Sequence, residues 1–154
     1  MAEAVLVHQA TETPLDDGAT LVDRLDVSSA GTGPWHEGEP MDTRADAALR
    51  RHGVPPGHHI ARQVQRARLG DLDLVVALDR RHHETLRSLG GGALEGRLVL
   101  LRAFDPNGGG ALDVPDPYYG DEQDFSRCLS QIEAGCRGLT SALARVVGPT
   151  ALPA

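Results

Sequence analysis

Lysine is absent from this sequence, and all 15 of its basic residues are arginines. That absence excludes the lysine of a nucleotide-binding phosphate loop, a Schiff-base lysine and the catalytic lysine of a kinase. Acidic residues number 22, so the formal net charge of the 154-residue chain is −7. A surface of this sign argues against a nucleic acid or an anionic membrane as a partner.

Long apolar runs and aromatic side chains are also scarce. No run reaches the roughly 18–20 apolar residues that span a bilayer, and no charged segment followed by an apolar one opens the chain as a secretory leader does. One tryptophan, two tyrosines and two phenylalanines make up 3% of the residues. The core is therefore expected to consist of leucine, valine and alanine, and each aromatic residue stands out.

Cysteine occurs only twice, as Cys128 and Cys136. The two lie on an expected helix, where a rise of about 1.5 Å per residue separates them by about 12 Å. A disulfide needs a much shorter distance between the two Cα atoms. We therefore expect reduced thiols and a cytoplasmic protein.

Helices and strands are expected to alternate along the chain. The first elements are helices over 1–12, 43–52 and 80–89, and strands over Leu25–Ser29, Leu72–Leu78 and Arg97–Leu101. Asp42 and Asp79 are expected to cap the second and third helices, because a short carboxylate can accept hydrogen bonds from the first turn. The run 72–78 is apolar almost throughout, as in a parallel strand buried on both faces. The pattern predicts one α/β domain over residues 1–148 and a flexible tail over 149–154.

The last helix is expected from the spacing of its apolar residues. These follow one another at intervals of four and three residues and form one stripe: Phe125, Leu129, Ile132, Cys136, Leu139, Leu143 and Val146. Acidic residues at its start, Asp121, Glu122 and Asp124, suit the positive end of the helix dipole. We expect this helix to pack on a face of the sheet, with Cys136 in the stripe and Cys128 beside it.

Residues 113–120 read DVPDPYYG, in which an acid is fixed by a following proline and precedes two adjacent tyrosines. Two further motifs come earlier, AGTGPW at 30–35 and HIARQ at 59–63. In this order the three motifs resemble the low-molecular-weight protein tyrosine phosphatases, and similar segments extend over nearly the whole chain. One motif alone would be a weak signal, since Asp-Pro-Tyr-Tyr-Gly is most often a solvated turn.

The resemblance implies a fold and a chemistry. The fold is a three-layer α/β domain with a parallel four-stranded sheet flanked by helices. Asp116 is implied to be the general acid, which protonates the tyrosine oxygen as it leaves the phosphate. Trp35, Tyr118 and Tyr119 are implied to form a slot for the substrate ring, and His59 to support the phosphate loop. The implied substrates are phosphotyrosine-containing proteins or small aryl phosphates, with no cofactor.

The chain departs from the family at its reactive centre. The family takes its nucleophile and phosphate cradle from a C-x5-R-S/T loop, usually followed by P-M-A-E-A. Neither cysteine here begins such a loop, since Ala134 and Ala142 stand six positions after Cys128 and Cys136. We therefore expect the first central strand and its loop to be missing, and the chain by itself to be inactive. Because Met1 matches the methionine of the family's segment, we expect the true gene product to begin upstream.

Two alternatives to a phosphatase stay open. The first alternative is a remnant without catalytic activity that binds phosphoproteins or has a regulatory role. The second and weaker alternative is an arsenate reductase on the same fold. The latter chemistry needs additional resolving cysteines in a mobile segment, whereas both cysteines here fall on the last helix. A metal site is not expected, because adjacent histidines such as residues 58–59 and 82–83 point apart and have no further ligand at a suitable spacing.

Overall fold

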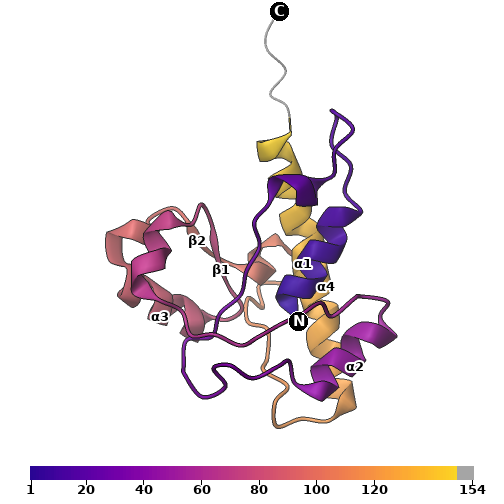
Figure 1. The fold of residues 1–154 in the computed structure, drawn as a ribbon, viewed down its shortest axis with the longest axis vertical. Coiled ribbons are helices and arrows are strands. Elements are labelled where there is room, and N and C mark those ends of the chain that lie inside the picture. Colours follow the sequence, from indigo (N-terminus) through magenta and orange to yellow (C-terminus); the bar gives the residue numbers. More distant parts are fainter. Residues whose placement is uncertain (149–154) are drawn as a thin grey trace, which may run out of the picture.

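A computed structural model describes residues 1–148 of the chain, which form helices, one small sheet and short 3-10 turns (Figure 1). The α-helices and strands are α1 (Ala2–Thr11), α2 (Thr43–Arg51), β1 (Val75–Ala77), α3 (Arg80–Gly90), β2 (Leu98–Leu100) and α4 (Glu122–Val147). Within the same residues the 3-10 turns are η1 (Leu21–Arg24), η2 (Arg66–Asp71), η3 (Gly91–Leu94) and η4 (Leu101–Phe104). The predicted tail, residues 149–154, lies outside the described residues.

The sheet consists of β1 and β2, which run parallel with α3 as the crossover between them. Val75 pairs with Leu98 and Ala77 with Leu100. Val75 and Ala77 pack in the cluster formed with α3, whereas Val76 packs in the larger core formed with α1, α2 and α4. The two faces of β1 therefore both pack against apolar residues, as its composition predicts, although only Ala77 of the strand is fully buried.

Of the three strands predicted for this chain, two are formed in the described residues, as β1 and β2 of the parallel sheet. The predicted strand over Leu25–Ser29 is not formed. Leu25 does have extended backbone angles, with φ −118° and ψ 136°. An extended segment becomes a strand only when a neighbour accepts and donates its backbone hydrogen bonds, and within residues 1–148 no strand lies alongside this one.

Two larger clusters of buried residues and a smaller one around Leu21 form the core of the described residues. In Figure 1, α1, α2 and α4 occupy one half of the molecule, and α3 with the two strands occupies the other. The larger core joins the helices of the first half, with Val5, Leu49, Leu129 and Ile132 among its fully enclosed residues. No helix within residues 1–148 combines the length and the apolar character needed to cross a membrane.

Capping side chains fix where three helices begin. Asp42 accepts a hydrogen bond from the N–H of Arg44 at 2.8 Å, and Asp79 accepts one from the N–H of His82 at 2.6 Å. Both predicted caps are confirmed. Asp121 caps α4 by accepting from two backbone N–H groups of the first turn, so the carboxylate satisfies donors that have no partner within the helix.

The apolar stripe of α4 is buried from Phe125 to Leu139, and both cysteines are buried as predicted. The prediction is wrong for Val146, whose side chain is 78% exposed. A stripe with an average spacing of 3.5 residues drifts around a helix of 3.6 residues per turn. By the last turn the drift brings Ala144 and Val147 against the small cluster around Leu21 instead.

Candidate active site

The loop that carries Asp116 is held at both of its ends. Directly after β1, the carbonyl of Leu78 accepts a hydrogen bond of 2.9 Å from the N–H of Val114. At the other end, Asp121 is the N-cap of α4. Residues 115–120, which we call the acid loop, therefore lie between one fixed point at the carboxyl end of β1 and another at the start of α4.

Asp113 adds two further contacts just before the acid loop. Its carboxylate accepts a hydrogen bond of 2.8 Å from the N–H of Arg80, the first residue of α3. Its carbonyl accepts one of 3.3 Å from Nη1 of Arg102, whose side chain is almost wholly buried. The start of the acid loop is therefore attached to α3 and η4 as well as to β1.

The acid loop turns tightly and presents its tyrosines to solvent. Oδ1 of Asp116 accepts a hydrogen bond of 3.0 Å from the N–H of Tyr118, and the N–H of Gly120 donates to the carbonyl of Pro117 at 2.8 Å. The rings of Tyr118 and Tyr119 meet edge to face, with centroids 5.0 Å apart. Tyr118 is 42% exposed and Tyr119 is 99% exposed, so a ligand can reach both rings.

A second loop, residues 34–40, carries Trp35 and is called the wall loop below. The indole is 79% exposed and lies over Gly33, where a Cβ atom would come within 1.8 Å of the ring. Position 33 therefore requires glycine for the indole to lie as it does. Two backbone hydrogen bonds of 2.8 Å, to residues 38 and 39, brace the wall loop against Ala61.

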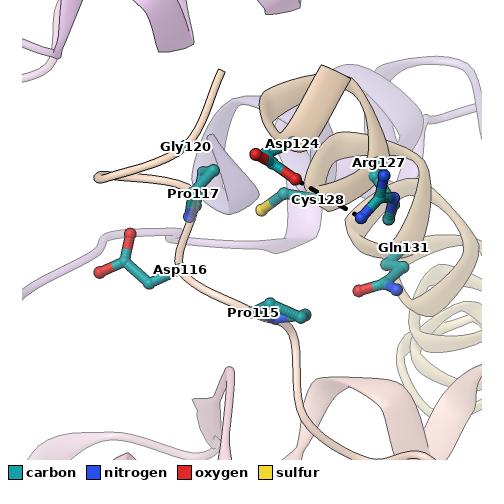
Figure 2. Close-up of a pocket in the computed structure, with 8 residues that line it drawn as sticks. All are labelled: Pro115, Asp116, Pro117, Gly120, Asp124, Arg127, Cys128 and Gln131. Atoms are coloured by element: carbon teal, nitrogen blue, oxygen red, sulfur yellow. Dashed lines mark hydrogen bonds and ion pairs between the residues drawn. The ribbon is translucent and has the colours of Figure 1, made fainter. Parts of the chain in front are cut away.

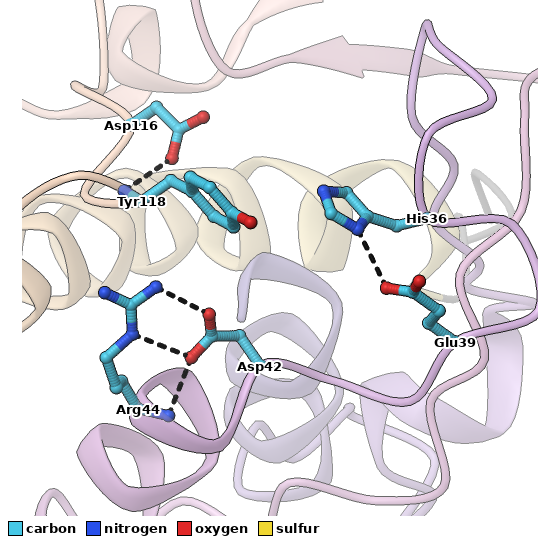
Figure 3. A network of polar contacts seen from close by, with 6 residues as sticks. All are labelled: His36, Glu39, Asp42, Arg44, Asp116 and Tyr118. Carbon is cyan, nitrogen blue, oxygen red and sulfur yellow. Dashed lines mark hydrogen bonds and ion pairs between the residues drawn. The ribbon is translucent and has the colours of Figure 1, made fainter.

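The wall loop and the start of α2 meet the acid loop at Tyr118 (Figure 3). The ring centroids of His36 and Tyr118 are 5.6 Å apart, and the His36 ring is also 2.8 Å from the carboxylate of Glu39. The guanidinium of Arg44 lies 5.6 Å from the Tyr118 centroid. Hydrogen bonds from the Arg44 side chain hold the pKa of Asp42 below its ordinary value, so the pair stays charged near neutral pH.

A cavity of about 270 Å³ lies between the acid loop and α4 (Figure 2). Its lining residues are Pro115, Asp116, Pro117, Gly120, Asp124, Arg127, Cys128 and Gln131. Burial raises the pKa of the Cys128 thiol to about 11, and the neighbouring Asp116 contributes in the same direction. Burial also raises the pKa of Cys136, to about 12, with a further contribution from Glu133. Both thiols are therefore protonated near neutral pH.

His59 lies beside the first turn of α1. Its Nδ1 atom is 3.6 Å from a carboxylate oxygen of Glu3, and the hydroxyl of Ser29 donates to the same carboxylate. The structure thus places His59 apart from the contacts around Tyr118. Its supporting role in a phosphate site stays a prediction.

Sequence reasoning missed Arg44 and His36 as parts of this site. The Asp-x-Arg spacing at the start of α2 is a local signal for the pair of Asp42 with Arg44. No pattern in the sequence connects either residue with Tyr118, because that contact depends on the tertiary fold. Within residues 1–148 no three histidine, cysteine or acidic side chains are grouped so that they could hold a metal ion.

The structure contains a βαβ unit with helices on both faces, which defines an α/β protein. The loop with Asp116 begins at the carboxyl end of the first strand. Sheets of this kind usually bind their ligands at that end. The family described as low molecular weight phosphotyrosine protein phosphatase matches residues 1–148. The chain belongs to this family.

Named relatives agree with this membership. The chain is 45% identical over 145 residues to a low molecular weight protein-tyrosine-phosphatase of Streptomyces coelicolor, covering 93% of this chain and 84% of the relative. It is 46% identical over 140 residues to low molecular weight protein-tyrosine phosphatase A of Mycobacterium tuberculosis, covering 90% and 80% of the two chains. The family inferred from the three motifs is thereby confirmed.

Solved structures extend the agreement to the fold. A protein tyrosine phosphatase from Entamoeba histolytica, crystallised with Hepes in its active site, superposes with a TM-score of 0.82 at 26% identity. That match covers 94% of this chain and 88% of the other. YfkJ from Bacillus subtilis superposes with a TM-score of 0.79 at 30% identity and covers 95% and 86%. The arrangement of elements described above is therefore that of solved phosphatases.

Proposed function

We propose that this chain hydrolyses phosphotyrosine monoesters once a C-x5-R-S/T loop completes its site, with Asp116 as the general acid. One observation carries the proposal: Asp116 stands at the exposed tip of a loop that is held at both ends, directly beside the paired rings of Tyr118 and Tyr119. An aryl phosphate that lies on these rings brings its ester oxygen toward the carboxyl group.

Asp116 has two tasks in this proposal. It protonates the phenolic oxygen as the bond to phosphorus breaks, and then removes a proton from the water that hydrolyses the phosphocysteine. A positioned acid of this kind contributes roughly 10²- to 10⁴-fold in rate. Pro117 restricts Asp116 to extended backbone angles, which helps to direct its carboxylate.

The proposed substrate is a phosphotyrosine-containing protein or a small aryl phosphate. Tyr118, Tyr119 and Trp35 are all accessible, and aromatic rings of this kind contribute about 0.5–1.5 kcal/mol per favourable ring pair beyond the area that they bury. A short phosphoserine side chain gains none of this ring contact. The names of the relatives, which are protein tyrosine phosphatases, support the same substrate class.

Neither cysteine of the chain supplies the nucleophile in this proposal. A cysteine nucleophile must be accessible and ionised near neutral pH. Cys128 and Cys136 are 5% and 1% exposed, and their thiol pKa values are raised to about 11 and about 12. The same burial argues against an arsenate reductase, whose cysteines must move and exchange. The 154 residues alone are therefore proposed to have no turnover.

Hydrolysis of p-nitrophenyl phosphate by two proteins tests the proposal. The first is the 154-residue chain, which we expect to show no vanadate-sensitive turnover. The second is the same chain extended at its amino end by a strand and loop of the family's C-x5-R-S/T form, which we expect to be active. The matched control has serine in place of the cysteine in that added loop, and we expect it to be inactive.

Turnover by the unextended chain would contradict the proposed need for the added loop. An extended chain that is folded but inactive would contradict the proposed phosphatase function. If that inactive protein bound phosphotyrosine peptides, the non-catalytic phosphoprotein-binding alternative would be favoured. Reading the in-frame DNA upstream of the Met1 codon tests separately whether the gene itself encodes a C-x5-R-S/T loop.

A further inference from the structure

The side chain of Tyr118 is the point at which the acid loop contacts the opposite side of the site. The ring of His36 approaches from the wall loop, with a centroid distance of 5.6 Å. The guanidinium of Arg44 approaches from the first turn of α2, also at 5.6 Å from the ring centroid. Tyr119, by contrast, is 99% exposed. Within residues 1–148, the only aromatic ring that its own ring contacts is that of Tyr118. The two adjacent tyrosines therefore have different environments.

Arg44 is itself held by the N-cap of its own helix and by a ring of α4. Its Nε and Nη2 atoms donate to the two carboxylate oxygens of Asp42, at 3.1 and 2.8 Å, and so fix the plane of the guanidinium. The same guanidinium lies 4.8 Å from the ring centroid of Phe125, which is buried in the first turn of α4. A planar cation between two aromatic rings interacts favourably with both. Arg44 therefore connects the starts of α2 and α4 with the acid loop.

We propose that Arg44 is a positioning residue for Asp116 and acts through Tyr118. The connection has two steps. Arg44 limits the positions open to the Tyr118 ring, and the N–H of Tyr118 donates to Oδ1 of Asp116 at 3.0 Å. Fixing the ring fixes the backbone that holds the carboxylate, and so reduces the range of directions in which Asp116 points. The inference rests on the proposed role of Asp116 as general acid.

The chain provides a matched control on the same helix. Arg50 donates from Nε and Nη2 to the carboxylate of Asp46, at 2.7 and 3.3 Å, in the same two-bond arrangement. Within the described residues no aromatic ring lies against the Arg50 guanidinium. Arg50→Ala therefore removes an arginine–aspartate pair from α2 without removing a contact to Tyr118.

The test uses the 154-residue chain labelled with 3-fluorotyrosine. Its two tyrosines give two fluorine NMR signals, which Tyr118→Phe and Tyr119→Phe assign. We expect Arg44→Ala to move the Tyr118 signal toward that of an unfolded peptide and to leave the Tyr119 signal in place. Arg50→Ala is expected to move neither signal.

Exchange of the Tyr118 amide proton with water tests the second step. Asp116→Ala removes the carboxylate that accepts this hydrogen bond. It therefore gives the exchange rate of the Tyr118 amide when it has no hydrogen bond. We expect Arg44→Ala to raise the exchange rate several-fold toward that limit, because the hydrogen bond is populated less often. Far-UV circular dichroism shows whether each variant is folded. If Arg44→Ala is not folded, Arg44→Lys replaces it, since lysine keeps the charge and loses the planar fork.

An unchanged Tyr118 signal and an unchanged amide exchange rate in a folded Arg44 variant would overturn the inference. Equal effects of Arg44→Ala and Arg50→Ala would also overturn it, because they would indicate a general effect on α2. Neither measurement depends on turnover. Failure of the extended chain to hydrolyse an aryl phosphate would therefore count against the proposed function and not against the contact of Arg44 with Tyr118.

Discussion

At the scale of single residues, folding changes the chemistry of the two cysteines. Burial is the main cause of the raised thiol pKa values, about 11 for Cys128 and about 12 for Cys136. An unfolded cysteine has a pKa of about 8.5. The chain has no lysine whose ammonium group would titrate between these values.

The raised thiol pKa values predict a loss of stability in alkali. Below about pH 8.5 the thiols are protonated in both the folded and the unfolded chain, and their contribution to the free energy of unfolding is fully present. As pH rises toward 11 the unfolded chain releases these protons and the folded chain retains them, so the free energy of unfolding falls. Urea unfolding at a series of pH values between about 8 and 11 measures the decline.

The double variant Cys128→Ala, Cys136→Ala is the control for this prediction. It is expected to be less stable at every pH, because smaller side chains leave a cavity. Its free energy of unfolding should nevertheless fall less steeply above about pH 9 than that of the unaltered chain. The same steepness in both proteins would show that other groups cause the decline.

At the scale of elements, α4 and η4 approach each other closely at Gly138. A Cβ atom built on Gly138 would lie 1.8 Å from the carbonyl oxygen of Phe104. Glycine in the middle of a helix costs about 1 kcal/mol relative to alanine. Its presence in α4 is explained by this contact, which lets the two backbones touch.

Gly138→Ala is therefore expected to destabilise the protein in spite of the better helix propensity of alanine. The clash is with backbone, so η4 or α4 must shift, and overpacking of this kind costs about 1–3 kcal/mol. Gly70→Ala is the control, since an added Cβ at position 70 meets no atom within 4 Å. Urea unfolding of both variants measures the difference. If Gly138→Ala were as stable as Gly70→Ala, this would contradict the explanation that glycine at position 138 is required by the close packing of α4 on η4.

Elements that depend on local sequence were predictable, and those that depend on a distant partner were not. The stripe of α4 and the caps Asp42 and Asp79 follow from residues a few positions apart; both caps are confirmed, and the stripe is confirmed from Phe125 to Leu139. The strand expected over Leu25–Ser29 has a suitable pattern and fails because no strand lies alongside it among the described residues. Strand formation depends on pairing as much as on pattern.

At the scale of the whole molecule, the site is assembled from segments that are far apart in the sequence. The wall loop, the start of α2 and the acid loop meet around Tyr118, and the first turn of α4 adjoins them through the contact of Phe125 with Arg44. The family resemblance supplied Asp116, Trp35 and the two tyrosines as candidates. It could not supply Arg44, since the contact with Tyr118 exists only after α2 and α4 have packed together.

The identity of the proton donor is the central claim, and the turnover of an Asp116→Asn variant of the extended chain tests it most directly. Asparagine keeps the shape of the side chain and cannot transfer the proton. We predict that kcat for p-nitrophenyl phosphate falls by about 10²- to 10⁴-fold, while the affinity for vanadate is unchanged. An unchanged kcat would contradict the assignment of Asp116 as the general acid.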